Sequence, residues 1–412
     1  MFLNKSISKT IFVLSYYVLT LLLFDVILIL IGGFQPKYSY GNKDVGFGYP
    51  VEINHVSFDP VDSPDVPTHR ETTNSMGFKE VTEPEIPFDG IRVLFLGDSH
   101  MQGQCSNAET IPDRFESFAN AGQSIKYDAQ NGGYGGQSPA QYARVLIHKG
   151  LKLQPDIVVV GIYIGNDFFD LMRRDDRPWA SLNDNHLVWH EPDWVVFKNP
   201  DFKNSLLSKS RIYFLFNRIY VKTLKYTYSR AKYLYESAPK EVSFMKVFSF
   251  LNDIRIGKQF GKNWWNQNLI QHLYFKTFNK IDYTDELMKH IIMLYQEICS
   301  RHNIRLVIAP IPSAFQIYPT KIAERYKPLQ HEIPELGSFD TVLKFLDKRY
   351  DFIKNVCNEL NIEFYDLRIP LKRNALKNEL YYPIDFHINP KGNTVVAQFL
   401  AKQILNNNNK DH

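Results

Sequence analysis

The chain has 412 residues, 44% of them hydrophobic and 22% charged, which is ordinary for a globular protein and enough for one elaborated domain or two or three smaller ones. Its formal net charge of +4 is too small to indicate a nucleic-acid-binding protein. The three cysteines, Cys105, Cys299 and Cys357, show no paired or metal-type spacing. This spacing argues against a disulfide framework or a zinc site and leaves a single disulfide open.

An apolar stretch at residues 11–33 is long enough to cross a bilayer as one helix. Asp25 is its only charge, and the surrounding Leu, Ile, Val and Phe offset the roughly 2.5–3.5 kcal/mol that a buried carboxylate costs. A cleaved signal peptide is the alternative, but signal peptides have a shorter apolar region that ends in a small-residue cleavage site, and the stretch 11–33 has no such site. Because Lys5 and Lys9 precede the stretch, we expect a single-pass anchor with a cytoplasmic N-terminus and the rest of the chain outside.

Residues 34–90 are rich in Pro, Asp and Tyr and show little periodicity. Five prolines between residues 60 and 87 argue against a long helix. The composition predicts a stalk and an irregular lead-in to the next domain.

The first buried strand is predicted at residues 92–96, which are mostly apolar and rich in strand-forming types. It leads directly into Gly97-Asp98-Ser99, and Gly103 follows. Glycine allows a sharp turn and a close approach of the backbone to a ligand. The serine therefore falls at the carboxyl end of a strand, where open α/β sheets bind their ligands. An ordinary polar turn after a strand is the alternative.

Strands and helices then alternate, with helices predicted at 110–122 and 141–150 and strands at 125–131 and 156–164. The first of these strands enters the glycine-rich segment 131–136, Asn-Gly-Gly-Tyr-Gly-Gly. The second is a continuous apolar run, as a central parallel strand requires, and it ends at Gly165-Asn166-Asp167.

The alternation breaks at residues 170–280, which contain all five tryptophans. Between Asp201 and Glu236 this insert has eight Lys and Arg residues and no acidic one. One interpretation is a cap that lies on anionic lipid or holds a polysaccharide. The simpler interpretation, which we favour, is a pair of helices with solvated basic faces and inward-packed Tyr and Phe.

The alternation then resumes, with helices predicted at 284–302, 339–360 and 394–405 and strands at 305–310 and 362–366. Near the C-terminus, Asp385-Phe386-His387 is followed by the segment 389–392, Asn-Pro-Lys-Gly. The Asn-rich tail at 406–412 is expected to be frayed.

Ser99 and His387 have the residue types of a nucleophile and its base. A serine hydroxyl needs a base to take its proton, and the base needs a third group to fix its tautomer. In an extended segment, Asp385 and His387 would point to the same side, so the carboxylate could reach Nδ1 while Nε2 faces Ser99. The alternatives are a turn histidine and a capping carboxylate beside the next helix.

Serine, glycine, asparagine and histidine blocks in this order resemble the SGNH (GDSL-type) hydrolase family over residues 74–405, with a poorly matched middle. Residues 74–78 resemble the Asn-Ser-x-Gly-Phe lead-in of its membrane-anchored bacterial branch. The resemblance implies a flavodoxin-like three-layer α/β/α fold with a central parallel sheet, and a serine esterase. Two departures stand out: His100 replaces the family's leucine, and Asp385 precedes His387 by two residues, where many members have three.

The resemblance also implies three donors of an oxyanion hole: the backbone N–H groups of Ser99 and Gly136 and the side-chain amide of Asn166. The family's glycine is the second one in an Asn-x-x-x-x-Gly run, which assigns Gly136 rather than Gly132 or Gly133. A flexible glycine turn and an asparagine that caps the next helix are the alternatives.

Two competing motifs are weaker. Ser138, in the segment 136–140, lacks the last glycine of a Gly-x-Ser-x-Gly elbow and follows a weak strand. Gly133 and Gly135 lack the third glycine of a dinucleotide-binding loop. We therefore expect no cofactor and no metal. His100 either lines the pocket or is an exposed neighbour of the nucleophile.

We expect four parts: a cytoplasmic tip and transmembrane anchor (1–33), a stalk and lead-in (34–90), an SGNH-type domain (91–405) with a helical and aromatic insert at about 170–280, and the tail. The expected function is hydrolysis or transfer of O-acyl groups on a cell-envelope or exported carbohydrate, outside the membrane, by Ser99, His387 and Asp385. The alternatives are a non-catalytic carbohydrate-binding or assembly component of an envelope polysaccharide system, and a lipid esterase. The oligomeric state stays open.

Overall fold

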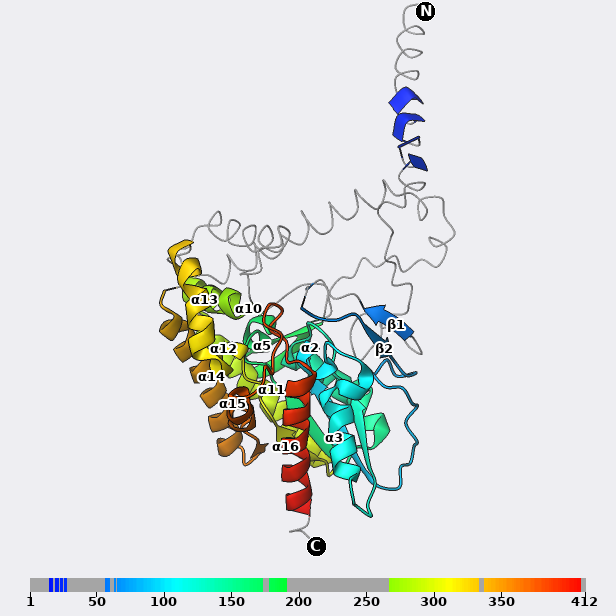
Figure 1. Cartoon of the computed structure of the whole chain (residues 1–412). Helices are drawn as coiled ribbons and strands as arrows, with labels where there is room; N and C mark the ends of the chain where they lie inside the picture. The colour runs from blue at the N-terminus through cyan, green and yellow to red at the C-terminus, as the bar shows by residue number, and fades with distance from the viewer. Residues whose placement is uncertain are drawn as a thin grey trace, which may run out of the picture. The chain divides into compact units, whose positions relative to one another are not determined.

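The computed structural model describes residues 56–59, 63, 65–172, 178–190, 267–332 and 337–408, with scattered helical positions between 15 and 27 (Figure 1). The chain divides into two units, Met1–Tyr40 with Asp193–Asp253, and Gly41–Pro192 with Ile254–His412. In the first unit, the description covers only the helical positions between 15 and 27. The second unit contains all the strands that the structure describes, together with the candidate site.

A five-stranded parallel sheet forms the centre of the second unit, in the order β4-β3-β5-β8-β9. Its strands are β3 (Ile91–Gly97), β4 (Tyr127–Asn131), β5 (Ile157–Gly161), β8 (Arg305–Ile308) and β9 (Glu363–Phe364). Counted within the sheet this order is 2-1-3-4-5, that of flavodoxin-like folds. The sequence predicted all five strands.

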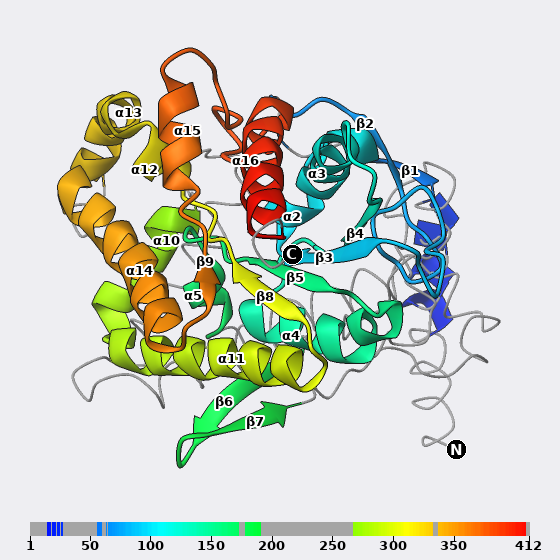
Figure 2. The same ribbon diagram turned by 90° about the horizontal axis from the view of Figure 1, so that it is seen from below.

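Helices cover both faces of the sheet, which explains the continuous apolar run of β5 and the mostly apolar β3. Figure 2 shows α3 (Ile111–Asn120) and α16 (Pro390–Asn408) on one face, with α4 (Pro139–His148) and α11 (Ile281–Arg301) on the other. The expected central parallel sheet between helical layers is therefore confirmed. The remaining helices include α10 (Gln267–Phe278), α12 (Ala314–Ile317), α13 (Pro319–Glu332), α14 (Phe339–Glu359) and α15 (Arg368–Ala375), and two 3-10 turns, η1 (Asn107–Glu109) and η2 (Gly150–Leu153).

The lead-in is more ordered than its sequence predicted. Strands β1 (Val56–Asp59) and β2 (His69–Thr72) pair antiparallel, and the segment after them contains Phe78, Lys79 and Glu80, all buried. Its polar composition hid this packing, because the buried charges are satisfied by one another and by backbone groups rather than by an apolar face. Residues 34–55 of the predicted stalk lie outside the described residues.

The insert begins with a β-hairpin, which the expectation of a helical and aromatic insert did not include. Strands β6 (Trp179–Asn183) and β7 (His186–His190) are joined by Asp184 and Asn185, both with positive φ, as a two-residue hairpin turn requires. At its other end, α10 is helical and buries residues 271–275. The basic stretch between Asp201 and Glu236 lies outside the described residues, and so do both interpretations of it, the favoured pair of helices and the alternative cap.

Among the described residues, no helix is long and apolar enough to cross a membrane. Most of the predicted anchor at residues 11–33, and the last residues of the predicted tail, lie outside the description.

Candidate active site

Ser99 lies directly after the central strand β3, at its carboxyl end. Gly97 ends the strand, Asp98 caps the short helix α2 (Ser99–Gln102), and the Asp98 carboxylate accepts the N–H of His100 at 2.9 Å. A Cβ atom at Gly97 would lie 2.7 Å from Cβ of Met101 and 3.0 Å from the carbonyl oxygen of Gly161. Glycine is therefore needed for the chain to turn so tightly beside the neighbouring strand, and this turn presents the serine.

Ser99 and His387 are in contact although they lie 288 residues apart in the sequence. Ser99 Oγ lies 2.6 Å from His387 Nε2, and His387 Nδ1 makes a short hydrogen bond to Asp385 Oδ1. The backbone N–H of His387 donates to the same carboxylate oxygen at 3.2 Å. With its proton on Nδ1 and directed at Asp385, the imidazole presents Nε2 as an acceptor for the serine hydroxyl. The three predicted residues thus form a continuous hydrogen-bonded chain.

The two-residue offset works through a turn and not, as the sequence suggested, through an extended segment. Phe386 has φ +68° and its N–H donates to the carbonyl of Tyr382 at 3.0 Å, while the N–H of Tyr382 donates to the carbonyl of His387 at 2.8 Å. This left-handed residue, uncommon for a bulky side chain, folds Asp385 back toward His387. The Tyr382 hydroxyl also donates to the carbonyl of Gln104 at 3.0 Å, which fastens the loop to the segment after α2.

Charges around His387 favour its protonated form. Burial opposes a charge on the imidazole, but the hydrogen bond and charge of Asp385, aided by Asp98, hold the pKa of His387 above its ordinary value. Burial would likewise raise the pKa of Asp385, yet its hydrogen bond to His387 keeps that pKa below the ordinary range. Burial raises the pKa of Asp98 to about 7. Asp385 is therefore the ionised partner that stabilises an imidazolium.

His100 is buried beside the loop that contains Asp385 and His387, so the exposed neighbour, one of the two alternatives for this residue, is wrong. Its ring stacks on Tyr163 at a centroid distance of 3.6 Å and lies 4.6 Å from the ring of His387. Burial and the nearby His387 hold the pKa of His100 well below its ordinary value, so it stays neutral. A Cβ at Gly165 would lie 2.4 Å from the Tyr163 ring, so this glycine makes room for the stack.

The glycine-rich segment runs alongside the serine turn. Its N–H groups donate in succession: Gly132 to Phe95 O, Gly133 to Asn131 Oδ1, Tyr134 to Gly97 O, and Gly135 to Gln102 Oε1. A Cβ at Gly135 would lie 3.7 Å from Cβ of Ser99, which brings the segment next to the nucleophile. Gly136, the expected oxyanion donor, follows with φ +69°.

Asn166 lies after β5, at the N-cap position of α5 (Asp167–Asp170), but its side chain makes no capping hydrogen bond to this helix. Its side chain is buried and its amide N–H₂ donates to Asp170 at 2.8 Å. Asp167 accepts the N–H of Tyr163 at 2.7 Å, which fixes the loop between β5 and α5. The hydrogen bond to Asp170 holds the Asn166 amide in one orientation and leaves a second amide N–H on the same nitrogen.

The C-terminal third of the chain matches a known family. Residues 279–412 match the model of a family described as "SGNH hydrolase-like domain, acetyltransferase AlgX". The chain carries an SGNH hydrolase-like domain. The matched part includes Asp385 and His387.

Three solved structures resemble the chain at a distance. They are a proposed acylhydrolase from Bacteroides fragilis (13% identity, 80% of this chain, 92% of the other, TM-score 0.33), a proposed lipolytic protein of the G-D-S-L family from Desulfitobacterium hafniense (11%, 76%, 99%, 0.32) and an acetyl xylan esterase (13%, 77%, 98%, 0.34). These similarities are too distant to carry an argument about activity. The curated proteins gave no match.

The weaker sequence candidates have other places in the SGNH domain. Ser138 is buried at the start of α4, where its backbone N–H donates to Gln141 Oε1 at 2.8 Å as part of the helix cap. Cys105, Cys299 and Cys357 are buried free thiols, so the disulfide left open does not form. Within the described residues, no group of three or more His, Cys, Asp or Glu could hold a metal ion.

Three polar residues near the glycine segment were not predicted from the sequence: Glu71, Lys79 and Gln102. Glu71 belongs to no motif. The available signals were positional, since Lys79 directly follows the lead-in motif and Gln102 lies three residues after Ser99.

Proposed function

We propose that the protein is a membrane-anchored serine esterase or acyltransferase that acts on O-acyl groups of a cell-envelope or exported carbohydrate. The observation that carries the proposal is the 2.6 Å contact of Ser99 Oγ with His387 Nε2, with His387 bound in turn to Asp385. The family match, whose description includes an acetyltransferase, supports acyl transfer as the type of reaction. The carbohydrate is the part that rests on the family resemblance.

In the proposed reaction, Ser99 Oγ attacks the ester carbonyl while His387 Nε2 takes the hydroxyl proton. The carbonyl oxygen becomes an oxyanion, which the N–H groups of Ser99, Gly136 and Asn166 would stabilise. The C–O bond to the alcohol then breaks, and the alcohol leaves with the proton from His387. Water or a sugar hydroxyl, deprotonated by His387, next attacks the acyl-serine and releases Ser99 with its proton restored.

The electrostatics of the site suit these reaction steps. The His387 imidazole must hold a proton only while the tetrahedral intermediate exists, and the ionised Asp385 stabilises that imidazolium. The Asn166 amide uses one N–H for Asp170, so its other N–H is the one we assign to the oxyanion.

The membrane anchor is the second half of the proposal. It rests on the apolar stretch 11–33, in which described helical positions such as Leu19 and Leu23 are 70% and 62% exposed. A helix with apolar side chains facing outward is suited to a lipid environment. The lysines before it support a cytoplasmic N-terminus and an extracytoplasmic SGNH domain.

The decisive experiment compares hydrolysis of p-nitrophenyl acetate by the full chain and by Ser99→Ala and His387→Ala. Loss of either residue is expected to lower kcat by about three orders of magnitude or more, because the nucleophile or its base is gone. Ser138→Ala is the matched control, a buried serine at a helix cap, expected to keep the kcat of the folded enzyme. A fluorophosphonate probe should label Ser99 and not the Ser99→Ala protein.

A folded wild type that is no faster than Ser99→Ala, and that the probe does not label, would rule out acyl-enzyme chemistry. The non-catalytic binding component would then be the better explanation. Labelling of Ser99 without hydrolysis would instead favour transfer to a sugar hydroxyl over transfer to water.

A further inference from the structure

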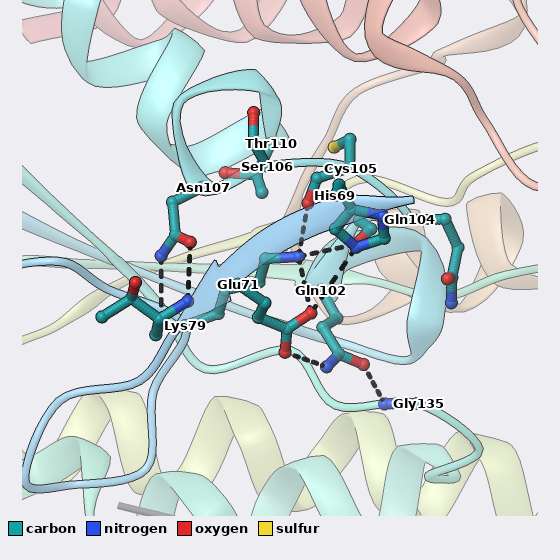
Figure 3. A network of polar contacts seen from close by, with 12 residues as sticks. His69, Glu71, Lys79, Gln102, Gln104, Cys105, Ser106, Asn107, Thr110 and Gly135 are labelled. Carbon is teal, nitrogen blue, oxygen red and sulfur yellow. Dashed lines mark hydrogen bonds and ion pairs between the residues drawn. The ribbon is translucent and has the colours of Figure 1, made fainter. Parts of the chain in front are cut away.

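A buried lysine lies beneath the serine turn. The side chain of Lys79 is 1% exposed, and its ammonium donates to Glu71 Oε2 at 3.0 Å and to the carbonyl oxygens of Gly103 at 2.9 Å and Cys105 at 2.7 Å (Figure 3). Three donors thus meet three acceptors. A buried charge with all its hydrogen bonds satisfied indicates a rigid site.

Glu71 is held ionised in this setting. Burial would raise its pKa, but His69, Lys79 and Gln102 together lower it to about 2. Its second oxygen, Oε1, accepts a hydrogen bond from Gln102 Nε2 at 3.0 Å. The carboxylate therefore joins the lysine to the glutamine.

Gln102 extends this hydrogen-bond network to the glycine segment. Its Oε1 accepts the backbone N–H of Gly135 at 2.8 Å, while its Nε2 donates to Glu71. A carboxylate can only accept and a backbone N–H can only donate, so a single orientation of the amide satisfies both neighbours. The charge of Glu71 therefore fixes which end of Gln102 faces Gly135.

This contact spans the two loops that the proposed reaction uses. Gln102 belongs to the same short helix as Ser99, and Gly135 lies beside Ser99 and immediately before Gly136. We propose that Gln102, oriented by Glu71 and Lys79, is a positioning residue that holds the glycine segment and its oxyanion donor at the distance from Ser99 that the reaction needs. This inference rests on the proposed function.

Displacement of an oxyanion donor weakens binding of the transition state more than binding of the ester. Variants of the network should therefore lower kcat and leave KM nearly unchanged. A residue with a purely structural role would lower the melting temperature without changing the kcat of the folded enzyme.

The test exchanges the carboxylate of Glu71 and the amide of Gln102, because their hydrogen bond could form again with donor and acceptor reversed. The variants are made in the full chain and assayed with p-nitrophenyl acetate. In Glu71→Gln, the new amide N–H₂ faces the N–H₂ of Gln102, so two donors oppose each other, or Gln102 turns its N–H₂ toward the N–H of Gly135. Gln102→Glu sets two carboxylates against each other. In the double variant, the carboxylate introduced at position 102 could accept from both Gly135 and the amide introduced at position 71. The oxygen of that new amide could still accept from Lys79.

Each single variant is expected to lower kcat about 10- to 100-fold, less than the loss of a whole oxyanion donor, with KM within about twofold. The double variant should recover kcat to within about fivefold of wild type. Asn107→Ala is the matched control. Asn107 exchanges two hydrogen bonds with the backbone of Thr72, on the same strand as Glu71. Figure 3 shows Asn107 apart from Gln102 and Gly135. The Asn107→Ala protein should melt at a lower temperature than wild type and keep the wild-type kcat.

Amide hydrogen exchange across residues 131–138 gives a readout that does not depend on activity. The single variants should exchange faster than wild type there, and the double variant should regain protection. Single variants with wild-type kcat, or a double variant no better than the singles, would overturn the inference. Inactivity of wild type itself would overturn the proposed function, and unchanged exchange in the single variants would by itself overturn the positioning contact.

Discussion

His387 connects the chemistry of the site to pH. Only the neutral imidazole can take the Ser99 proton, so kcat/KM for ester hydrolysis should rise with pH through the pKa of His387. Since Asp385 holds that pKa above the ordinary 6.5, the inflection should lie above 6.5. Asp385→Asn should move the inflection to lower pH and lower the plateau by up to about four orders of magnitude. The measurement is kcat/KM from about pH 5 to about pH 9, and an inflection that moves upward in Asp385→Asn would contradict the assignment.

Stability should depend on His387 in the opposite sense. A folded-state pKa above the unfolded value stabilises the fold at a pH below about 6.5, and this contribution is lost as pH rises through the folded-state pKa. The residue therefore stabilises the fold most where it is least active as a base. His387→Ala should remove this pH dependence from chemical denaturation curves.

At the residue scale, the sequence predicted the residues to which we assign the chemistry and missed those that we propose hold them in place. Ser99, Asp385 and His387 were predictable because each belongs to a motif with a chemical requirement. Their meeting depends on Phe386 in a left-handed conformation, which no local pattern signals. Glu71 is a polar residue in a polar lead-in, and only the fold shows that it faces Gln102.

Among the elements, β3 and its surroundings depend on one buried arginine. Arg92 Nε donates to Asp128 Oδ2 on β4 at 2.5 Å, Nη1 donates to the carbonyl of Leu153 at 2.5 Å, and Nη2 donates to the carbonyl of Glu85 in the lead-in. One side chain thus fastens three segments to the central strand. Its guanidinium fork suits several acceptors at fixed angles.

Arg92→Met is expected to lower the free energy of unfolding by about 3–5 kcal/mol, because it leaves a carboxylate and two carbonyls without their donor. Urea denaturation followed by tryptophan fluorescence measures this. Asp128→Asn, which keeps the arginine and its contacts to Leu153 and Glu85, should cost less. Equal losses in the two variants would mean that the ion pair alone accounts for the effect of Arg92.

The strands differ in how well they can be predicted from the sequence. β5 and most of β3 are apolar because both faces of the sheet are covered, so both strands were predicted. The predicted bounds of β3 differ from the observed ones by one residue at each end, whereas β5 was predicted three residues too long at its C-terminal end. The β6–β7 hairpin was missed, although Asp184-Asn185 between two strand-like segments is a turn signal. The tryptophans and basic residues that follow drew the prediction toward helices.

For the whole molecule, the proposed anchor has a direct test. The full chain should stay with the membrane fraction after washes at high salt and alkaline pH, because about 20 apolar residues insert far more stably than a surface charge patch binds. A chain without residues 1–33 should be released by the same washes. Protease added outside intact cells stripped of their wall should cleave the SGNH domain. Release of the full chain, or protection of the domain, would contradict the proposed arrangement.

The nucleophile and its base lie 288 residues apart in the chain, and that separation has a consequence in time. At roughly 5–20 residues per second, the ribosome adds His387 about 15 to 60 s after Ser99. During that interval the serine turn can fold, with Glu71, Lys79 and Gln102 already made, but its hydroxyl has no base. A chain that ends before His387 is therefore expected to lack the proposed esterase activity, which can begin only after His387 has been added.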